Sequence, residues 1–256
     1  MLTRYFLRLA YNGSAYSGWQ FQPNAPSVQE ELEKILSAML HEKITVVGCG
    51  RTDAGVHASM YIAHIDATRN DLHSDAQFLF RLNKSLPGDI SVDRVTAVPE
   101  NAHARFSATA RSYTYHIIQN KRALLNGLSW YVHEPLNLEH MNEAAKTILH
   151  HDDFISFSKT GGEMKTSLCR ISESAWTEQD GQLTYRITSN RFLRNMVRMC
   201  VGTMAEVGAG RMSPLRVKEL LDAKKQPAVL HVAPANGLYL SDVKYPAALF
   251  ISTANK

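Results

Sequence analysis

The chain has 256 residues, of which 45% are apolar and 20% charged, and its 28 Lys and Arg against 24 Asp and Glu give a formal net charge of +4. This composition supports a hydrophobic core and excludes a disordered or low-complexity chain. No apolar run approaches the ~20 residues that span a bilayer, and Arg4 and Arg8 interrupt the first apolar stretch, so we expect a cytoplasmic protein with neither a signal peptide nor a membrane partner.

The first hundred residues predict four strands and two helices. One helix covers residues 28–41 and begins with the capping-box pattern of Ser27 and Glu30. The other covers residues 74–86 and ends before a Pro-Gly pair. The strands, which are rich in β-branched and aromatic residues, are predicted at residues 5–11, 44–47, 59–65 and 90–98.

The second half repeats this plan. Strands are predicted at residues 112–119, 171–176, 183–188 and 238–243, and helices at residues 138–149, 192–207 and 214–223. The order of strand, helix, two strands, helix and strand is typical of a ferredoxin-like unit. We therefore predict an α+β fold of two ferredoxin-like α/β-sandwich halves, residues 1–104 and 105–256, whose mostly antiparallel sheets join around a central cleft.

The most unusual segment is a glycine-punctuated loop at residues 48–58, which reads GCGRTDAGVHA. Its three glycines allow the backbone to approach a ligand closely. An Asp in such a loop is commonly an Asx turn or a helix cap. Here Arg51 and His57 place complementary charge around Asp53, an arrangement that keeps a carboxylate ionised, as a nucleophile must be.

Residues 50–58 resemble the signature of the TruA family of tRNA pseudouridine synthases. The similarity continues along the chain, although Asn12 stands where the family commonly has Asp and Cys49 where Ser or Ala is usual. The further matching segments are residues 11–14 (YNGS), 18–20 (GWQ), 103–108 (HARFSA), 111–115 (RSYTY), 192–198 (FLRNMVR) with Gly202, and Pro234 with 237–240 (GLYL).

The resemblance implies a catalytic function and assigns roles to three residues. Asp53 is implied as the nucleophile, Tyr113 as the ring beside the target uracil, and Arg198 as the partner of Asp53. Pseudouridine formation breaks the bond from uracil N1 to C1′ and rejoins the base through C5. Because this isomerisation involves no redox change and no group donor, we expect no cofactor.

The implied substrate is tRNA, in particular uridines of the anticodon stem-loop at positions 38–40. The target base must be flipped out of its stack at a cost of ~a few kcal/mol, and family members of this kind act as homodimers. The residues expected to bind RNA or substrate are mostly basic or aromatic: Arg51, Arg69, His103, Arg105, Phe106, Arg111, Tyr113, Arg194 and Leu238. Lys121, Arg122 and Arg191 are further candidates, and residues 159–170 are expected to form an RNA-facing loop.

Isolated site residues also have ordinary structural interpretations. Tyr113 alternates with Tyr115 on a predicted strand, which is typical of packing. Arg191, Arg194 and Arg198 are spaced three and four residues apart and would share one face of a predicted helix, which is commonly solvated. Apolar neighbours border that face, so a salt bridge from Arg198 to Asp53 is expected instead.

Metal and disulfide chemistry are not expected. The three cysteines are scattered, which indicates reduced thiols. Residues 150–153 (HHDD) are ligand types, but adjacent residues cannot all face one ion. Two other functions stay open at this point, a non-catalytic RNA-binding protein of the same fold and, with less support, a hydrolase with an Asp nucleophile.

Overall fold

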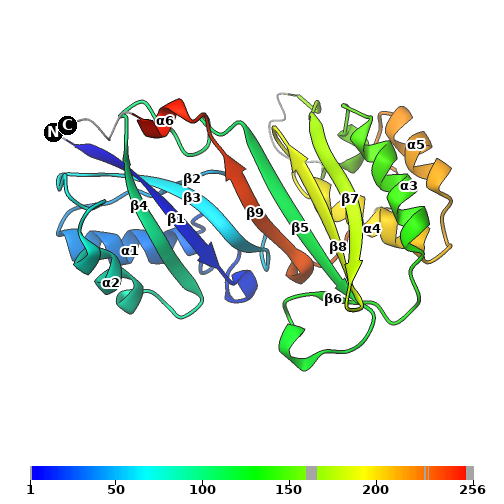
Figure 1. Ribbon diagram of the computed structural model, residues 1–256, viewed down its shortest axis with the longest axis horizontal. Coiled ribbons are helices and arrows are strands. Elements are labelled where there is room, and N and C mark those ends of the chain that lie inside the picture. The colour runs from blue at the N-terminus through cyan, green and yellow to red at the C-terminus, as the bar shows by residue number, and fades with distance from the viewer. Residues whose placement is uncertain (1, 160–165, 228, 230, 252–256) are drawn as a thin grey trace. The chain divides into compact units, whose positions relative to one another are not determined.

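The computed structural model describes residues 2–159, 166–227, 229 and 231–251. The chain forms two compact units, one of residues Met1–Ala110 with Leu240–Lys256 and one of residues Arg111–Tyr239. Figure 1 shows the helices and strands of each unit. The α+β class is confirmed, and most strand pairs whose register is described are antiparallel, whereas residues 117–118 pair parallel with residues 130–131.

The first unit is built on a single sheet. Its strands are β1 (Thr3–Tyr11), β2 (Val47–Gly48), β3 (His57–Ala67), β4 (Ile90–Val98) and residues 240–244 of β9 (Leu238–Lys244). The order is β4-β1-β3-β9, with β2 paired to β3. Buried and exposed residues alternate along much of β4, whereas β3 is buried along most of its length, so β3 forms the centre of this unit.

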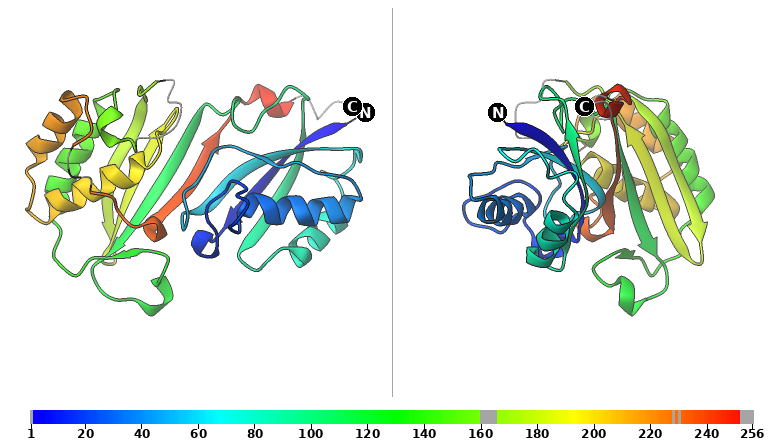
Figure 2. Two further views of the ribbon diagram at one scale, coloured as in Figure 1. Left: turned by 180° about the vertical axis from the view of Figure 1, so that it is seen from behind. Right: turned by 60° about the vertical axis from the view of Figure 1, so that its left-hand side comes forward.

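Helices α1 (Val28–Leu40) and α2 (Ala76–Ser85) cover one face of this sheet, as the rear view in Figure 2 shows. The apolar stripe of α1 includes Leu32 and Leu36, both fully buried. Ser27 accepts a hydrogen bond from the backbone N–H of Glu30, so the predicted helix start is confirmed.

The C-terminal residues belong with the first unit, whereas our sequence prediction placed them in a second half of residues 105–256. The physical reason is that residues from the end of the last strand onward contact other residues of the first unit. The carbonyl of Lys244 accepts from the backbone N–H of Thr109 at 2.8 Å, and the ring of Tyr245 packs on Phe6. Helix α6 (Ala248–Ile251) follows and places Phe250 against the same ring.

The second unit contains β5 (Ala110–Ile118, all but its first residue), β6 (Trp130–Tyr131), β7 (Ile171–Gln179) and β8 (Gln182–Ser189), in the order β5-β8-β7 with β6 beside β5. Its helices are α3 (Leu138–Leu149), α4 (Met196–Gly208) and α5 (Pro214–Asp222). Helix α3 packs on β7 and on both other helices. Nearly every residue of α4 is buried, so this helix is the core of the unit.

Two predicted elements differ from the structure. The strand predicted at residues 44–47 is reduced to β2, because side chains of α1 take its backbone N–H groups: Ser37 accepts from Ile44, and Glu33 accepts from Val46. The helix predicted at 192–207 begins only at Met196, because Asn195 adopts a left-handed conformation with φ of 61°.

Four short 3₁₀ segments were not predicted. They are η1 (Gly13–Ala15), η2 (Ala123–Leu125), η3 (Ile155–Phe157) and η4 (Ala235–Gly237). Within the ranges that the structure describes, no helix is both long and apolar enough to cross a bilayer.

Candidate active site

The aspartate loop, defined here as residues 50–56, lies in the first unit between β2 and β3. Asp53 is half-buried and Arg51 is exposed. The carbonyl of Asp53 accepts a hydrogen bond of 3.1 Å from the backbone N–H of Val56, which closes a tight turn, and Gly55 within it has φ of 76°. The loop therefore presents one carboxylate and one guanidinium from a fixed backbone.

A second glycine allows another segment to approach this loop. Gly18 has φ of 103°, and a Cβ placed there would lie 2.4 Å from the carbonyl oxygen of Thr52 and 3.2 Å from the carbonyl carbon of Asp53. Real Cβ atoms do not approach a backbone so closely, so only glycine fits. The 18–20 motif of the sequence thus packs directly on the aspartate loop.

His57 has a structural role in this loop and not the charged role that we predicted. Its ring is 1% exposed, and its Nδ1 accepts a hydrogen bond of 3.1 Å from the backbone N–H of Gly13. A ring nitrogen that accepts carries no proton, so the ring in this arrangement is neutral. His57 ties the loop to η1 and does not supply positive charge to Asp53.

Tyr113 and Phe192 form an aromatic pair in the second unit. Tyr113 is half-buried on β5, and the ring of Phe192 meets it edge-on at 5.1 Å between centroids with an interplanar angle of 89°. This geometry is favourable for aromatic pairs, and it fixes the orientation of the tyrosine ring.

Arg198 lies on α4, and backbone atoms of Ala233 hold it on both sides. Its Nε donates to the carbonyl of Ala233 at 2.8 Å, and its own carbonyl accepts from the Ala233 N–H at 3.0 Å. Leu238 begins β9 and is 5% exposed. The predicted catalytic residues thus come from both units: Asp53 from the first, Tyr113 and Arg198 from the second.

Arg191 and Arg194 precede α4, so the predicted sharing of one helical face with Arg198 is wrong. Arg191 instead donates to the carbonyl of Thr166 at 2.8 Å, and the carbonyl of exposed Arg194 accepts from the N–H of Lys159. Arg111 on β5 donates to the carbonyl of Asn190 at 3.4 Å. Of the loop predicted at residues 159–170, residues 160–165 lie outside the described part of the chain.

Residues 103–106 form a compact turn that presents two exposed side chains, Arg105 and Phe106. Nδ1 of His103 accepts from the backbone N–H groups of both, at 3.1 and 3.3 Å. The Phe106 ring is 75% exposed, with the His103 ring 4.4 Å behind it and the Arg105 guanidinium 5.5 Å from its centroid. An exposed aromatic ring beside a cation is well suited to stacking on a nucleobase.

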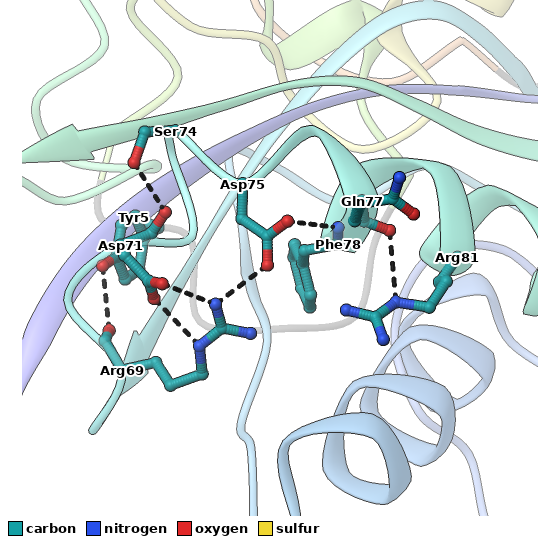
Figure 3. Close-up of polar contacts among 8 residues, drawn as sticks. All are labelled: Tyr5, Arg69, Asp71, Ser74, Asp75, Gln77, Phe78 and Arg81. Atoms are coloured by element: carbon teal, nitrogen blue, oxygen red, sulfur yellow. Dashed lines mark hydrogen bonds and ion pairs between the residues drawn. The ribbon is translucent and has the colours of Figure 1, made fainter.

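Arg69 has a different environment from the other arginines in the predicted RNA-binding set. Figure 3 shows its guanidinium between two carboxylates, 2.7 Å from Asp71 and 2.9 Å from Asp75. Its backbone carbonyl accepts from the buried Tyr5 hydroxyl at 2.8 Å. Asp75 also caps α2 by accepting from the backbone N–H of Phe78. Arg69 therefore links the segment after β3 to the start of α2.

The side chains that could bind a metal ion or act as thiols are the last candidates. Among the residues that the structure describes, no three His, Cys, Asp or Glu side chains lie close enough to hold an ion. The three cysteines are buried and outside any disulfide, as predicted, and burial raises the pKa of Cys169 to about 11.

The sequence interpretation missed the tyrosines that contact the aspartate loop. Tyr11 bonds to Thr52 at 2.8 Å, and Tyr61 donates to the carbonyl of Gly50. The carbonyl of Tyr16 accepts from Gly55 at 3.3 Å. Tyr11 belongs to the motif at residues 11–14, but the spacing of residues in the sequence does not indicate that its hydroxyl contacts Thr52.

Comparison with known proteins identifies relatives of this chain. A family model described as tRNA pseudouridine synthase matches residues 9–107 and 144–246. Asp53, Arg198 and Leu238 fall inside the matched segments, and Tyr113 falls between them.

Individual relatives match over nearly the full length. The chain is 44% identical to tRNA pseudouridine synthase A of Porphyromonas gingivalis over 98% of this chain and 100% of that protein. It is 44% identical to the protein of the same name from Bacteroides fragilis, over 96% and 98% of the two chains. The protein of that name from Escherichia coli O9:H4 is 42% identical, over 94% and 89%.

Proposed function

The chain belongs to the tRNA pseudouridine synthase family, and from this premise we propose how its residues carry out the isomerisation. As a member of this family it is an isomerase that acts on uridine in tRNA. The reaction breaks the glycosidic bond from N1 to C1′ and forms a bond from C5 to C1′. No atom is gained or lost in this isomerisation. We propose that the protein supplies a covalent anchor for the substrate, a place for the rotating base and a route for the C5 proton.

We propose Asp53 as the covalent anchor. The observation that carries this role is its position in the nine-residue match at 50–58, on a loop whose backbone is held from several sides. An ionised carboxylate can add either to the uracil ring or to C1′, and either route divides one difficult step into two easier ones. A rigid loop favours this step because the reacting oxygen is already aimed.

We assign three residues of the second unit to the reacting base and its nucleophile. Tyr113 offers a ring beside the uracil and a hydroxyl that can move the C5 proton, and Phe192 holds that ring in place. Leu238 supplies an apolar wall. Arg198 pairs with Asp53 and keeps it ionised. These roles require the sheets of the two ferredoxin-like halves to join around a cleft, which is the arrangement that the family resemblance implies.

RNA binding is assigned to the exposed basic and aromatic residues. Arg51 fills the space of the flipped base or binds the flanking phosphate, and the turn at residues 103–106 stacks on RNA. Arg111 and Arg194 contact phosphates. Arg69 is expected to contribute least, since two carboxylates already balance its charge.

Three finer statements complete the proposal and rest on family resemblance. The uridines modified are those of the anticodon stem-loop at positions 38–40, the active form is a homodimer, and the site of action is the cytoplasm, where mature tRNA is used. Recognition is expected to follow RNA shape and backbone more than sequence.

The decisive experiment incubates the protein and Asp53→Asn with unmodified tRNA and maps pseudouridine. We expect product at the anticodon stem-loop with the wild type and none with Asp53→Asn, a loss of about 10³-fold or more, while tRNA binding is retained. Product from Asp53→Asn contradicts the nucleophile assignment. No product from the wild type favours the alternative of a non-catalytic RNA-binding protein.

A further inference from the structure

We propose that the hydrogen bond between the side chains of Tyr11 and Thr52 is a positioning device that aims the Asp53 carboxylate. The inference rests on the proposed role of Asp53 as nucleophile and names two residues that act through it without touching the base. Tyr11 is the last residue of β1, and Thr52 directly precedes Asp53 in the aspartate loop.

The contact is buried and geometrically strong. The Tyr11 hydroxyl lies 2.8 Å from Thr52 Oγ1, and the two residues are 4% and 8% exposed. Water therefore has little access to replace either partner. The loss of one hydroxyl would leave the other buried without this bond, which is more costly than the bond itself is favourable.

Thr52 is held at its backbone as well. Its carbonyl oxygen accepts a hydrogen bond of 3.3 Å from the N–H of Trp19, and that same carbonyl meets Gly18 at the close approach described above. With side chain and carbonyl both fixed, the peptide between residues 52 and 53 has one orientation. Together with the bond from the Val56 N–H to the Asp53 carbonyl, this orientation restricts the direction in which the Asp53 side chain leaves the backbone.

The other side of the loop is anchored by contacts that do not involve the Tyr11 hydroxyl. Tyr61 donates to the carbonyl of Gly50, and its ring stacks on Trp19 at 4.0 Å between centroids. The carbonyl of Tyr16 accepts from the N–H of Gly55. Removal of the Tyr11 hydroxyl should therefore leave the loop in place and loosen it only at the residue beside the nucleophile.

This arrangement predicts an effect on chemistry that exceeds the effect on binding. A displacement of about 1 Å at a reacting group can cost on the order of 100-fold in rate. For Tyr11→Phe we expect the single-turnover rate constant for pseudouridine formation to fall by about 10- to 100-fold, with the Kd for tRNA changed by less than about two-fold, because neither hydroxyl is exposed to RNA.

A double-mutant cycle tests the pair directly, with Tyr11→Phe, Thr52→Val and the double variant. Because each single change removes the same bond, we expect the double variant to be no slower than the slower single variant. Thr52→Ser keeps the hydroxyl and is expected to restore most of the rate lost in Thr52→Val. Rate losses that multiply in the double variant, or a Tyr11→Phe rate within about two-fold of wild type, would overturn the proposal.

The chain offers a matched control. The hydroxyl of Tyr185 lies 2.8 Å from Ser174 Oγ, buried in the core of the second unit, so Tyr185→Phe removes the same type of bond far along the chain from the aspartate loop. We expect Tyr185→Phe to lower the melting temperature about as much as Tyr11→Phe and to leave the rate constant unchanged. Equal rate losses in both variants would show a general stability effect and contradict the proposal.

Asp53→Asn separates this inference from the proposal on which it rests. If Asp53→Asn is inactive and Tyr11→Phe is fully active, Asp53 keeps its role and the positioning inference fails. If Asp53→Asn remains active, the nucleophile assignment itself fails.

Discussion

Nδ1 of His64 accepts a hydrogen bond of 3.1 Å from the backbone N–H of Ala104. His64 lies on β3 and is 5% exposed. Burial, followed by the positive charge of Arg4, lowers the pKa of His64 to about 4. The bond ties the sheet of the first unit to the turn at residues 103–106, and it exists only while the imidazole is neutral, since a protonated Nδ1 cannot accept.

This bond predicts a loss of stability in mild acid. The unfolded chain binds a proton at His64 near pH ~6.5, whereas the folded protein does so only near pH 4. Between these values the unfolded state binds more protons, so the free energy of unfolding should decrease as pH falls, by up to about 3 kcal/mol. Urea unfolding at pH 7 and pH 4.5 measures the change.

His64→Asn is the control for this prediction, because its amide oxygen can accept from Ala104 without titrating. We expect a clearly smaller loss of stability between pH 7 and 4.5 in this variant. An unchanged pH dependence would show that other groups, and not His64, cause the acid sensitivity.

The second prediction concerns Arg69. Its guanidinium side chain is 38% exposed and bridges Asp71 and Asp75, so Arg69→Ala should lower the free energy of unfolding by about 1 kcal/mol. Asp75→Ala should cost more, because it also removes the side-chain cap of α2. The matched control is Arg81→Ala, which also lies on α2. The Arg81 guanidinium donates to the carbonyl of Gln77 at 3.3 Å. A larger loss in Arg81→Ala than in Arg69→Ala would contradict this interpretation.

The turn at residues 103–106 gives the third prediction. If Phe106 stacks on RNA, Phe106→Ala should weaken tRNA binding by about 1–3 kcal/mol. Phe80→Ala is a close control, since Phe80 is 60% exposed and has the Lys84 ammonium 5.6 Å from its ring centroid. Filter binding or fluorescence anisotropy at one salt concentration compares the two. Equal losses would mean that surface aromatics contribute without regard to position.

The elements that sequence patterning predicted correctly are those whose own residues determine them. Helix α1 has both its apolar stripe and its Ser27 cap within its own segment, so periodicity and capping are sufficient. The strand predicted at 44–47 failed for the opposite reason. Its apolar pattern is typical of a strand, but Ser37 and Glu33 of the preceding helix accept hydrogen bonds from its N–H groups. The sequence of the segment itself does not indicate these contacts.

The candidate site also contains features that the local sequence indicates and features that depend on residues far away in the chain. The motif at residues 50–58 singles out Asp53 as the proposed nucleophile, because residue identity carries the resemblance. Spacing alone misassigned His57, since its role depends on a hydrogen bond from Gly13, more than forty residues earlier in the chain. The contact from Tyr11 to Thr52 is equally distant in sequence, and only the three-dimensional structure brings the two hydroxyls together.

The last prediction tests how closely the aspartate loop is packed. Gly18→Ala would place a Cβ 2.4 Å from the Thr52 carbonyl oxygen, at a residue whose φ is 103°. The left-handed conformation alone costs about 1–2 kcal/mol, and the overlap forces the peptide before Asp53 to move. We therefore expect a loss of more than about 2 kcal/mol of stability together with a fall in the single-turnover rate.

Gly88→Ala is the control, since a Cβ there meets nothing within 4 Å. That substitution should be neutral or stabilising by less than about 1 kcal/mol. If Gly18→Ala proves as stable and as active as Gly88→Ala, the aspartate loop is not held by the close approach of residues 18 and 52.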